Sequence, residues 1–154
     1  MSPRLSFAFL LLILTGGLAR AADIPRYTRF ETTFTSAKEY PNAFQDVQVR
    51  VGFTGPNNVR TTVDAFWDGE RTWRVRFSPE AEGEWTFATT ASDVANPGLH
   101  AQSGAFRCIP NRDTRNPIYQ PGPLRVSPDR THLEHADGTP FFWLADTTWA
   151  GALL

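Results

Sequence analysis

The stretch Val59-Arg-Thr-Thr-Val-Asp-Ala-Phe-Trp-Asp-Gly-Glu-Arg-Thr-Trp-Arg-Val-Arg-Phe77 decides the fold class. Apolar and polar side chains alternate along both halves, a period of two that is typical of β-strands with one face on a core and one in water. Asp68-Gly69 between the halves is a strong hairpin signal. A slip of one residue in the second half would bury the arginines that flank Val75, so the register is well specified. The first half places these residues on one face: Val59, Thr61, Val63, Ala65 and Trp67.

Alternation of the same kind extends from Thr28 to Ile109. The apolar residues between Val47 and Phe53 share one face, which predicts another strand on the core. A bend from Pro79 to Gly83 leads into a further strand, where we expect Trp85 to be the aromatic residue at the corner between two sheets. Seven strands or slightly fewer are expected, with no helix of any length. The sequence therefore predicts an all-β fold, an immunoglobulin-like β-sandwich.

The first 21 residues have the features of a secretory signal peptide. Arg4 precedes an apolar run from Phe7 to Leu14, and Ala19-Arg-Ala21 is the small-residue pattern of a cleavage site. A membrane-spanning helix needs about 20 apolar residues, which is far more than this run supplies. We therefore expect a protein that is secreted or periplasmic and that has no membrane attachment after cleavage.

Charge and cysteine content exclude some classes of function. Removing the leader takes away two of the 15 basic side chains and none of the 16 acidic ones, so the net charge is about −3. This balance gives no basic surface for nucleic acid. Cys108 is the only cysteine and cannot form an internal disulfide. Its position in the alternating run after Phe106 predicts a small buried apolar residue rather than a catalytic thiol.

The chain changes character after the predicted sandwich. Residues 111–121 form a polar linker bracketed by prolines, and a β-hairpin is expected between Leu124 and His135. The aromatic run Phe141–Leu144 predicts a strand buried on both faces, as parallel strands are. Asp146 offers a helix cap directly after it. A strand followed by a capped helix is half of a βαβ unit, and a closed (β/α)8 barrel needs roughly 250 residues, so residues 122–154 are expected to be only the truncated start of a barrel.

Two parts of the chain resemble a known family. The segment from Gly122 to Trp149 resembles the entry to the catalytic domain of apiosidase-like TIM-barrel glycoside hydrolases. An earlier part of the chain resembles the β-sandwich that precedes such barrels. The residues that carry this resemblance are Phe30-Glu-Thr-Thr-Phe34, Phe66-Trp-Asp-Gly69 and Trp73-Arg-Val-Arg-Phe-Ser-Pro79, on to Gly104-Ala-Phe106. The resemblance implies hydrolysis of polysaccharides by carboxylates on later barrel strands. No catalytic residue can therefore be assigned here, and the chain as given is expected to be inactive.

Three residues near the C-terminal end are candidates for substrate binding. Asp146 follows the apolar run at the end of a barrel strand where such enzymes gather their active-site residues, and it could bind a sugar hydroxyl or cap the following helix. Trp143 and Trp149 flank it, and tryptophan rings stack on the apolar faces of sugars. Without a barrel to cover them, these rings are expected to be exposed. At the hairpin end, Phe66 and Trp67 lie on opposite faces, so one of them should be partly exposed.

Other polar residues carry weaker signals. Hydrolysis of a glycosidic bond needs two carboxyl groups held about 5–10 Å apart. The acidic run from Glu80 to Glu84 is expected to be a solvated turn and not a catalytic pair. His132 and His135 are three residues apart in a predicted strand and would point to opposite faces. We therefore expect no metal site and no cofactor.

The sequence yields one interpretation and one alternative. Residues 1–21 are the signal peptide, 22–110 a non-catalytic accessory sandwich, 111–121 a linker, and 122–154 a hairpin with the first strand of an incomplete barrel. The intact protein would hydrolyse O-glycosidic bonds of a polysaccharide or oligosaccharide, and the sandwich would pack on the barrel. Alternatively, the sandwich is a carbohydrate-binding module that acts through exposed tryptophans.

Overall fold

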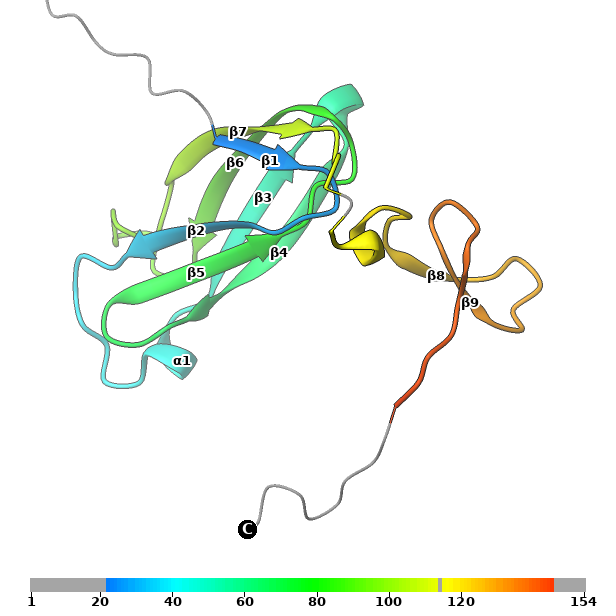
Figure 1. Ribbon diagram of the computed structural model, residues 1–154. Coiled ribbons are helices and arrows are strands. Elements are labelled where there is room, and N and C mark those ends of the chain that lie inside the picture. The colour runs from blue at the N-terminus through cyan, green and yellow to red at the C-terminus, as the bar shows by residue number, and fades with distance from the viewer. Residues whose placement is uncertain (1–21, 114, 146–154) are drawn as a thin grey trace, which may run out of the picture.

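The computed structural model describes residues 22–113 and 115–145 (Figure 1). Its elements in chain order are β1 Ala22–Pro25, β2 Phe30–Thr35, α1 Ala43–Asp46, β3 Val49–Thr54, η1 Pro56–Asn58, β4 Arg60–Trp67, β5 Thr72–Phe77, β6 Gly83–Ala91, β7 Ser103–Ile109, η2 Pro117–Tyr119, β8 Leu124–Val126, β9 Leu133–His135 and β10 Pro140–Phe141. Among the described residues the longest α-helix has four residues. The predicted all-β fold class is confirmed. No described helix has the length and hydrophobicity that a bilayer crossing requires.

Seven of the described strands form one sheet that folds over on itself. Its strand order is β1-β7-β6-β3-β4-β5-β2. β1 runs parallel to β7, and the other neighbours are antiparallel. β4 pairs with β3 from Arg60 to Ala65 and with β5 through Phe66 and Trp67. This strand therefore passes from one layer of the fold to the other, and Figure 1 shows β2 and β5 facing the layer of β3, β6 and β7.

Aromatic rings fill the space between the two layers. Phe30 of β2 stacks on Phe106 of β7 with ring centroids 4.1 Å apart, and Phe53 of β3 stacks on Phe77 of β5 at 4.2 Å. Phe30 also meets the edge of the Phe53 ring. Burial of such rings is a dominant favourable term in folding, and offset or edge contacts add to it. The layers are therefore held together by contacts between strands far apart in the sequence.

The structure confirms several predicted strand faces. Val49, Val51 and Phe53 are buried, as are Trp73 and Val75, while Arg74 and Arg76 point to the outer surface. Cys108 is buried and free, and burial raises the pKa of its thiol. The predictions for β3, β5 and the cysteine therefore hold.

Trp85 lies near the start of β6, directly after the bend from Pro79 to Gly83. Its side chain is buried, and its indole Nε1 donates to the carbonyl oxygen of Ala81 at 2.8 Å, across the bend that precedes β6. A buried tryptophan needs such an acceptor because an unpaired N–H in the core is costly. Trp85 therefore ties the bend to the core.

The predicted inner face of β4 is only partly correct. Val63 and Ala65 are half-buried, but Val59, Thr61 and Trp67 are exposed. The alternation is correct, yet β4 leaves one layer for the other, so the ends of its inner face extend beyond the core. A local pattern cannot reveal this crossing, because it depends on which strands pair.

The last described strands form a separate three-stranded sheet of order β10-β9-β8. β8 and β9 make the predicted hairpin, and Figure 1 shows it beside the folded sheet. The predicted strand Phe141–Leu144 differs from the structure. Only Phe141 pairs, antiparallel to β9, and residues 142–144 lie outside any strand with their side chains exposed. Within the described residues, no further strand lies beside them to accept their hydrogen bonds.

Candidate functional site

The turn between β4 and β5 fixes an exposed tryptophan. Asp68 and Thr72 close the turn, and Gly69 has a φ of 95°, which favours glycine. Glu70 follows with a φ of 47°, an uncommon value for a residue with a side chain. Its carbonyl oxygen accepts a hydrogen bond from Trp67 Nε1 at 2.9 Å. Trp67 as a residue is 42% exposed, so the turn holds one edge of the ring and leaves part of the residue open to solvent.

Two grooves include this ring in their lining. The first has a volume of about 680 Å³ and is lined by residues 39–43, Trp67, Glu70 and Arg71. The second, of about 610 Å³, is lined by Phe44, residues 64–67 and neighbours from the end of α1. Phe44 is 79% exposed. We call the two grooves with Trp67, Phe44 and Phe66 the Trp67 surface.

The volumes of the grooves suit a ligand. Each lies within the range of roughly 300–1,000 Å³ that is typical of small-molecule sites. Phe66 and Trp67 are both partly exposed, whereas the sequence predicted this for one of them. The Trp67 surface therefore combines accessible aromatic rings with polar groups, as ligand sites do.

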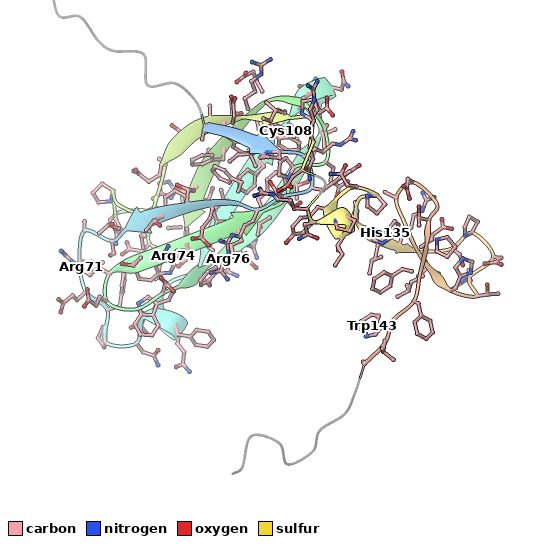
Figure 2. All side chains as sticks on the ribbon, viewed as in Figure 1. Arg71, Arg74, Arg76, Cys108, His135 and Trp143 are labelled. Carbon is pink, nitrogen blue, oxygen red and sulfur yellow. The ribbon has the colours of Figure 1, made fainter. Side chains whose placement is uncertain are left out.

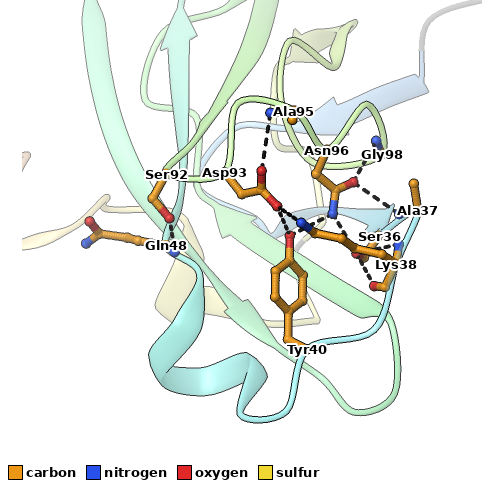
Figure 3. Close-up of polar contacts among 10 residues, drawn as sticks. All are labelled: Ser36, Ala37, Lys38, Tyr40, Gln48, Ser92, Asp93, Ala95, Asn96 and Gly98. Atoms are coloured by element: carbon orange, nitrogen blue, oxygen red, sulfur yellow. Dashed lines mark hydrogen bonds and ion pairs between the residues drawn. The ribbon is translucent and has the colours of Figure 1, made fainter.

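A buried hydrogen-bond network positions the loop that lines the first groove (Figure 3). Asn96 Nδ2 donates to Ser36 Oγ at 2.7 Å and to Tyr40 Oη at 2.8 Å. Asn96 Oδ1 accepts from the backbone N–H groups of Ala37 and Gly98, both at 3.1 Å. One amide side chain thus ties the loop after β2 to the loop after β6. Tyr40 packs edge-on against Trp73, with centroids 5.9 Å apart, which extends this anchoring to β5.

Charged groups complete the network. Lys38 Nζ lies 2.6 Å from Asp93 Oδ2, and Tyr40 donates its hydroxyl proton to the same oxygen at 2.7 Å. The hydrogen bond from Lys38 lowers the pKa of Asp93, and the bond to Asp93 raises the pKa of Lys38. Burial raises the pKa of Tyr40, so its phenol stays neutral and remains a donor. This arrangement serves to hold the loops.

A row of arginines follows β5 on the outer face (Figure 2). Arg74 and Arg76 both bond to Glu31 of β2, at 3.1 and 2.7 Å, and Arg74 also pairs with Asp68. The bond from Arg76 is the largest cause of the lowered pKa of Glu31. These carboxylates are therefore engaged in cross-strand ion pairs.

Of the three predicted substrate residues, only Trp143 lies in the described part of the chain. Trp143 is 69% exposed and lies on the segment after β10, away from the folded sheet (Figure 2). Asp146 and Trp149 lie outside the described residues. Glu80, Glu82 and Glu84 are exposed, as predicted. Within residues 22–113 and 115–145, no group of three or more potential ligands could hold a metal ion.

A smaller groove of about 280 Å³ lies at the junction between the two sheets. Tyr27 of the folded sheet and Phe141 of β10 are among its apolar walls. His135 is buried there, and its Nδ1 lies 2.8 Å from the carbonyl oxygen of Gly122. We interpret this groove as the seam between the sheets.

Sequence reasoning missed the network around Asn96. Asn96-Pro97-Gly98 indicated only an interruption between strands. The signal that could have found it is the Asn-Pro-Gly sequence itself, because asparagine side chains often bond to nearby backbone in turns. Its bonds to Ser36 and Tyr40, about 60 residues away, have no local signature.

Comparisons with known proteins agree with a carbohydrate-related chain. A family model described as Domain of unknown function (DUF5060) matches residues 23–92, and no curated protein matches. The crystal structure described as "a putative glycoside hydrolase from Bacteroides vulgatus ATCC 8482" is similar, with a TM-score of 0.62 and 28% sequence identity. The match covers 79% of this chain and 21% of that one. The chain thus spans about a fifth of that structure's length, and its expected similarity to a glycoside hydrolase is confirmed.

Proposed function

We propose that this chain is a non-catalytic accessory part of a secreted glycoside hydrolase that degrades polysaccharides. The single observation that carries the proposal is the similarity to the Bacteroides vulgatus structure, which the chain matches over about a fifth of its length. The intact protein would hydrolyse O-glycosidic bonds with two carboxyl groups from a domain outside this match. The present chain would support that domain.

In this proposal residues 22–110 are an immunoglobulin-like sandwich and residues 122–154 begin an apiosidase-like barrel. The buried Trp85, bonded back to Ala81, supports the first assignment, because sandwiches of this class often place an aromatic residue at the corresponding corner. Trp143, Asp146 and Trp149 would contact substrate in the intact protein, and the sandwich would pack on the barrel. The leader supports export to the periplasm or the medium.

Three carboxylates of the described residues support an accessory role. Glu31 and Asp93 accept hydrogen bonds from basic side chains, and Glu134 pairs with Arg125 at 2.8 Å. A glycosidase needs two carboxyl groups that face one substrate bond. Carboxylates held by cations stabilise loops and sheets instead.

The test compares the isolated chain with the native protein. The purified recombinant chain should release no product from aryl glycosides or from a polysaccharide panel. Antibodies raised against it should precipitate glycoside hydrolase activity from the medium or periplasm of the source organism. Turnover by the isolated chain, or a precipitate without such activity, would overturn the proposal.

A binding module is the second candidate function. It is favoured by the partial exposure of Trp67, whose indole is held by the Glu70 carbonyl rather than packed into the core. Such a module would concentrate an attached enzyme on its substrate.

A further inference from the structure

We infer that the Trp67 surface binds a neutral polysaccharide chain, with Trp67 under the middle of the bound segment. The inference rests on the proposed carbohydrate-active role and names a site for it. Trp67 lines both grooves, so a chain that occupies both of them can contact its indole. An aromatic ring with one edge fixed can stack on the apolar face of a sugar without first losing side-chain freedom.

The rims of the grooves supply partners for hydroxyl groups. Glu70 and Arg71 border the first groove together with Asn42, and Gln45 and Gln48 border the second. Carboxylate, amide and guanidinium groups can donate to or accept from a sugar hydroxyl. Polar groups around an exposed ring match a molecule that has apolar faces and a polar edge.

The charges of the site select a neutral ligand. In the first groove, Glu39 and Glu70 carry negative charge and Arg71 carries positive charge, whereas Asp64 of the second groove is paired with Arg50 at 3.4 Å. A polyanion such as a polyuronate would meet more carboxylates than cations in the first groove, and like charges repel. Glucans, xylans and mannans carry no charge and avoid this cost.

The walls of the first groove are preorganised for binding. Loop 36–42 is tied to loop 92–98 by Asn96 and by the Lys38–Asp93 ion pair. The other wall of the first groove belongs to the β4–β5 turn, which is closed by its own backbone hydrogen bonds. A wall that is already ordered loses less entropy on binding.

The experiment is isothermal titration of the full purified chain with soluble mixed-linkage β-glucan, xylan and galactomannan, and with polygalacturonate as the anionic comparison. Wild type should bind at least one neutral glycan saturably. We expect Trp67→Ala to weaken that binding at least tenfold, Phe44→Ala to weaken it severalfold, and Trp67→Phe to retain most of it. Phe142→Ala is the matched control, because this aromatic residue is more exposed than Trp67 but lines neither groove, and the substitution should change affinity less than twofold.

Several outcomes would overturn the inference. These are no neutral-glycan binding by wild type, tighter binding of polygalacturonate, unchanged binding by Trp67→Ala, or loss of binding by Phe142→Ala. Urea denaturation of each variant checks folding, and Phe44→Ala decides the result if Trp67→Ala does not fold. If the chain binds no neutral glycan but the antibodies still precipitate glycoside hydrolase activity, the binding inference is wrong and the proposed accessory role is retained.

Discussion

At the residue scale, the buried side chain of Asn96 joins two loops that are far apart in the sequence. It is 1% exposed and uses both its amide donor and its carbonyl acceptor on four partners. A buried polar group is tolerated only when its hydrogen bonds are made, because desolvation otherwise costs free energy. Asn96 meets this condition and fixes the loop that forms the wall of the first groove.

We therefore expect Asn96→Ala to lower the free energy of unfolding by about 1–3 kcal/mol, because it leaves the N–H groups of Ala37 and Gly98 without their acceptor. Urea denaturation followed by fluorescence measures the change. Asn42→Ala is the control, because this exposed residue makes no side-chain capping bond, and it should stay within about 0.5 kcal/mol of wild type. Equal effects of the two substitutions would contradict the role given to Asn96.

At the scale of elements, the loops after β2 and β6 are joined by charge as well as by the amide. The pKa of Asp93 is lowered in the folded chain, so its contribution is present above the ordinary carboxyl pKa of about 4 and is lost as the pH falls through the lowered value. Asp113 also has a lowered pKa, of about 2, but its partner Arg115 is two residues away. A contact so local can persist in the unfolded chain and then contributes little to the pH dependence of folding.

Unfolding should therefore depend on pH through Asp93. The free energy of unfolding of wild type should decrease as the pH is lowered from about 6 to about 3, and Asp93→Asn should flatten this slope. Asp113→Asn should leave the slope nearly unchanged. Urea titrations at several pH values measure both, and an identical slope in wild type and Asp93→Asn would show that the Lys38–Asp93 pair does not link folding to pH.

At the scale of the whole molecule, the core of the described residues belongs to the folded sheet and to the segments that connect its strands. Every buried apolar residue of the described core falls between Phe30 and Cys108. The β8–β10 sheet buries Ser127, Glu134 and His135, and its strands have three residues or fewer. Folding of the β8–β10 sheet removes little apolar surface from water, so this sheet gains little hydrophobic stabilisation.

The rate of amide hydrogen exchange should therefore differ between the folded sheet and the β8–β10 sheet. Amides of the central strands β3 and β6 should exchange only on global unfolding, and those of β8–β10 should exchange much faster through local opening. Mass spectrometry of peptic peptides measures both rates in one experiment. Equal protection across the two sheets would show that they unfold as one cooperative unit.

The sequence by itself determined the strands and many of their faces. Alternation along β3 and β5 identified Val49, Val51, Trp73 and Val75 as core residues, because the period of two is a property of the strand backbone alone. Asp68-Gly69 marked the turn for the same reason, since its backbone preference is local.

Only the tertiary structure decided how these elements meet. The passage of β4 between layers, the exposure of Trp67 and the burial of Asn96 depend on partners distant in the chain. The physical reason is that burial and hydrogen bonding depend on which residues from distant parts of the chain pack against a side chain. Periodicity indicates only which side of a strand a residue occupies.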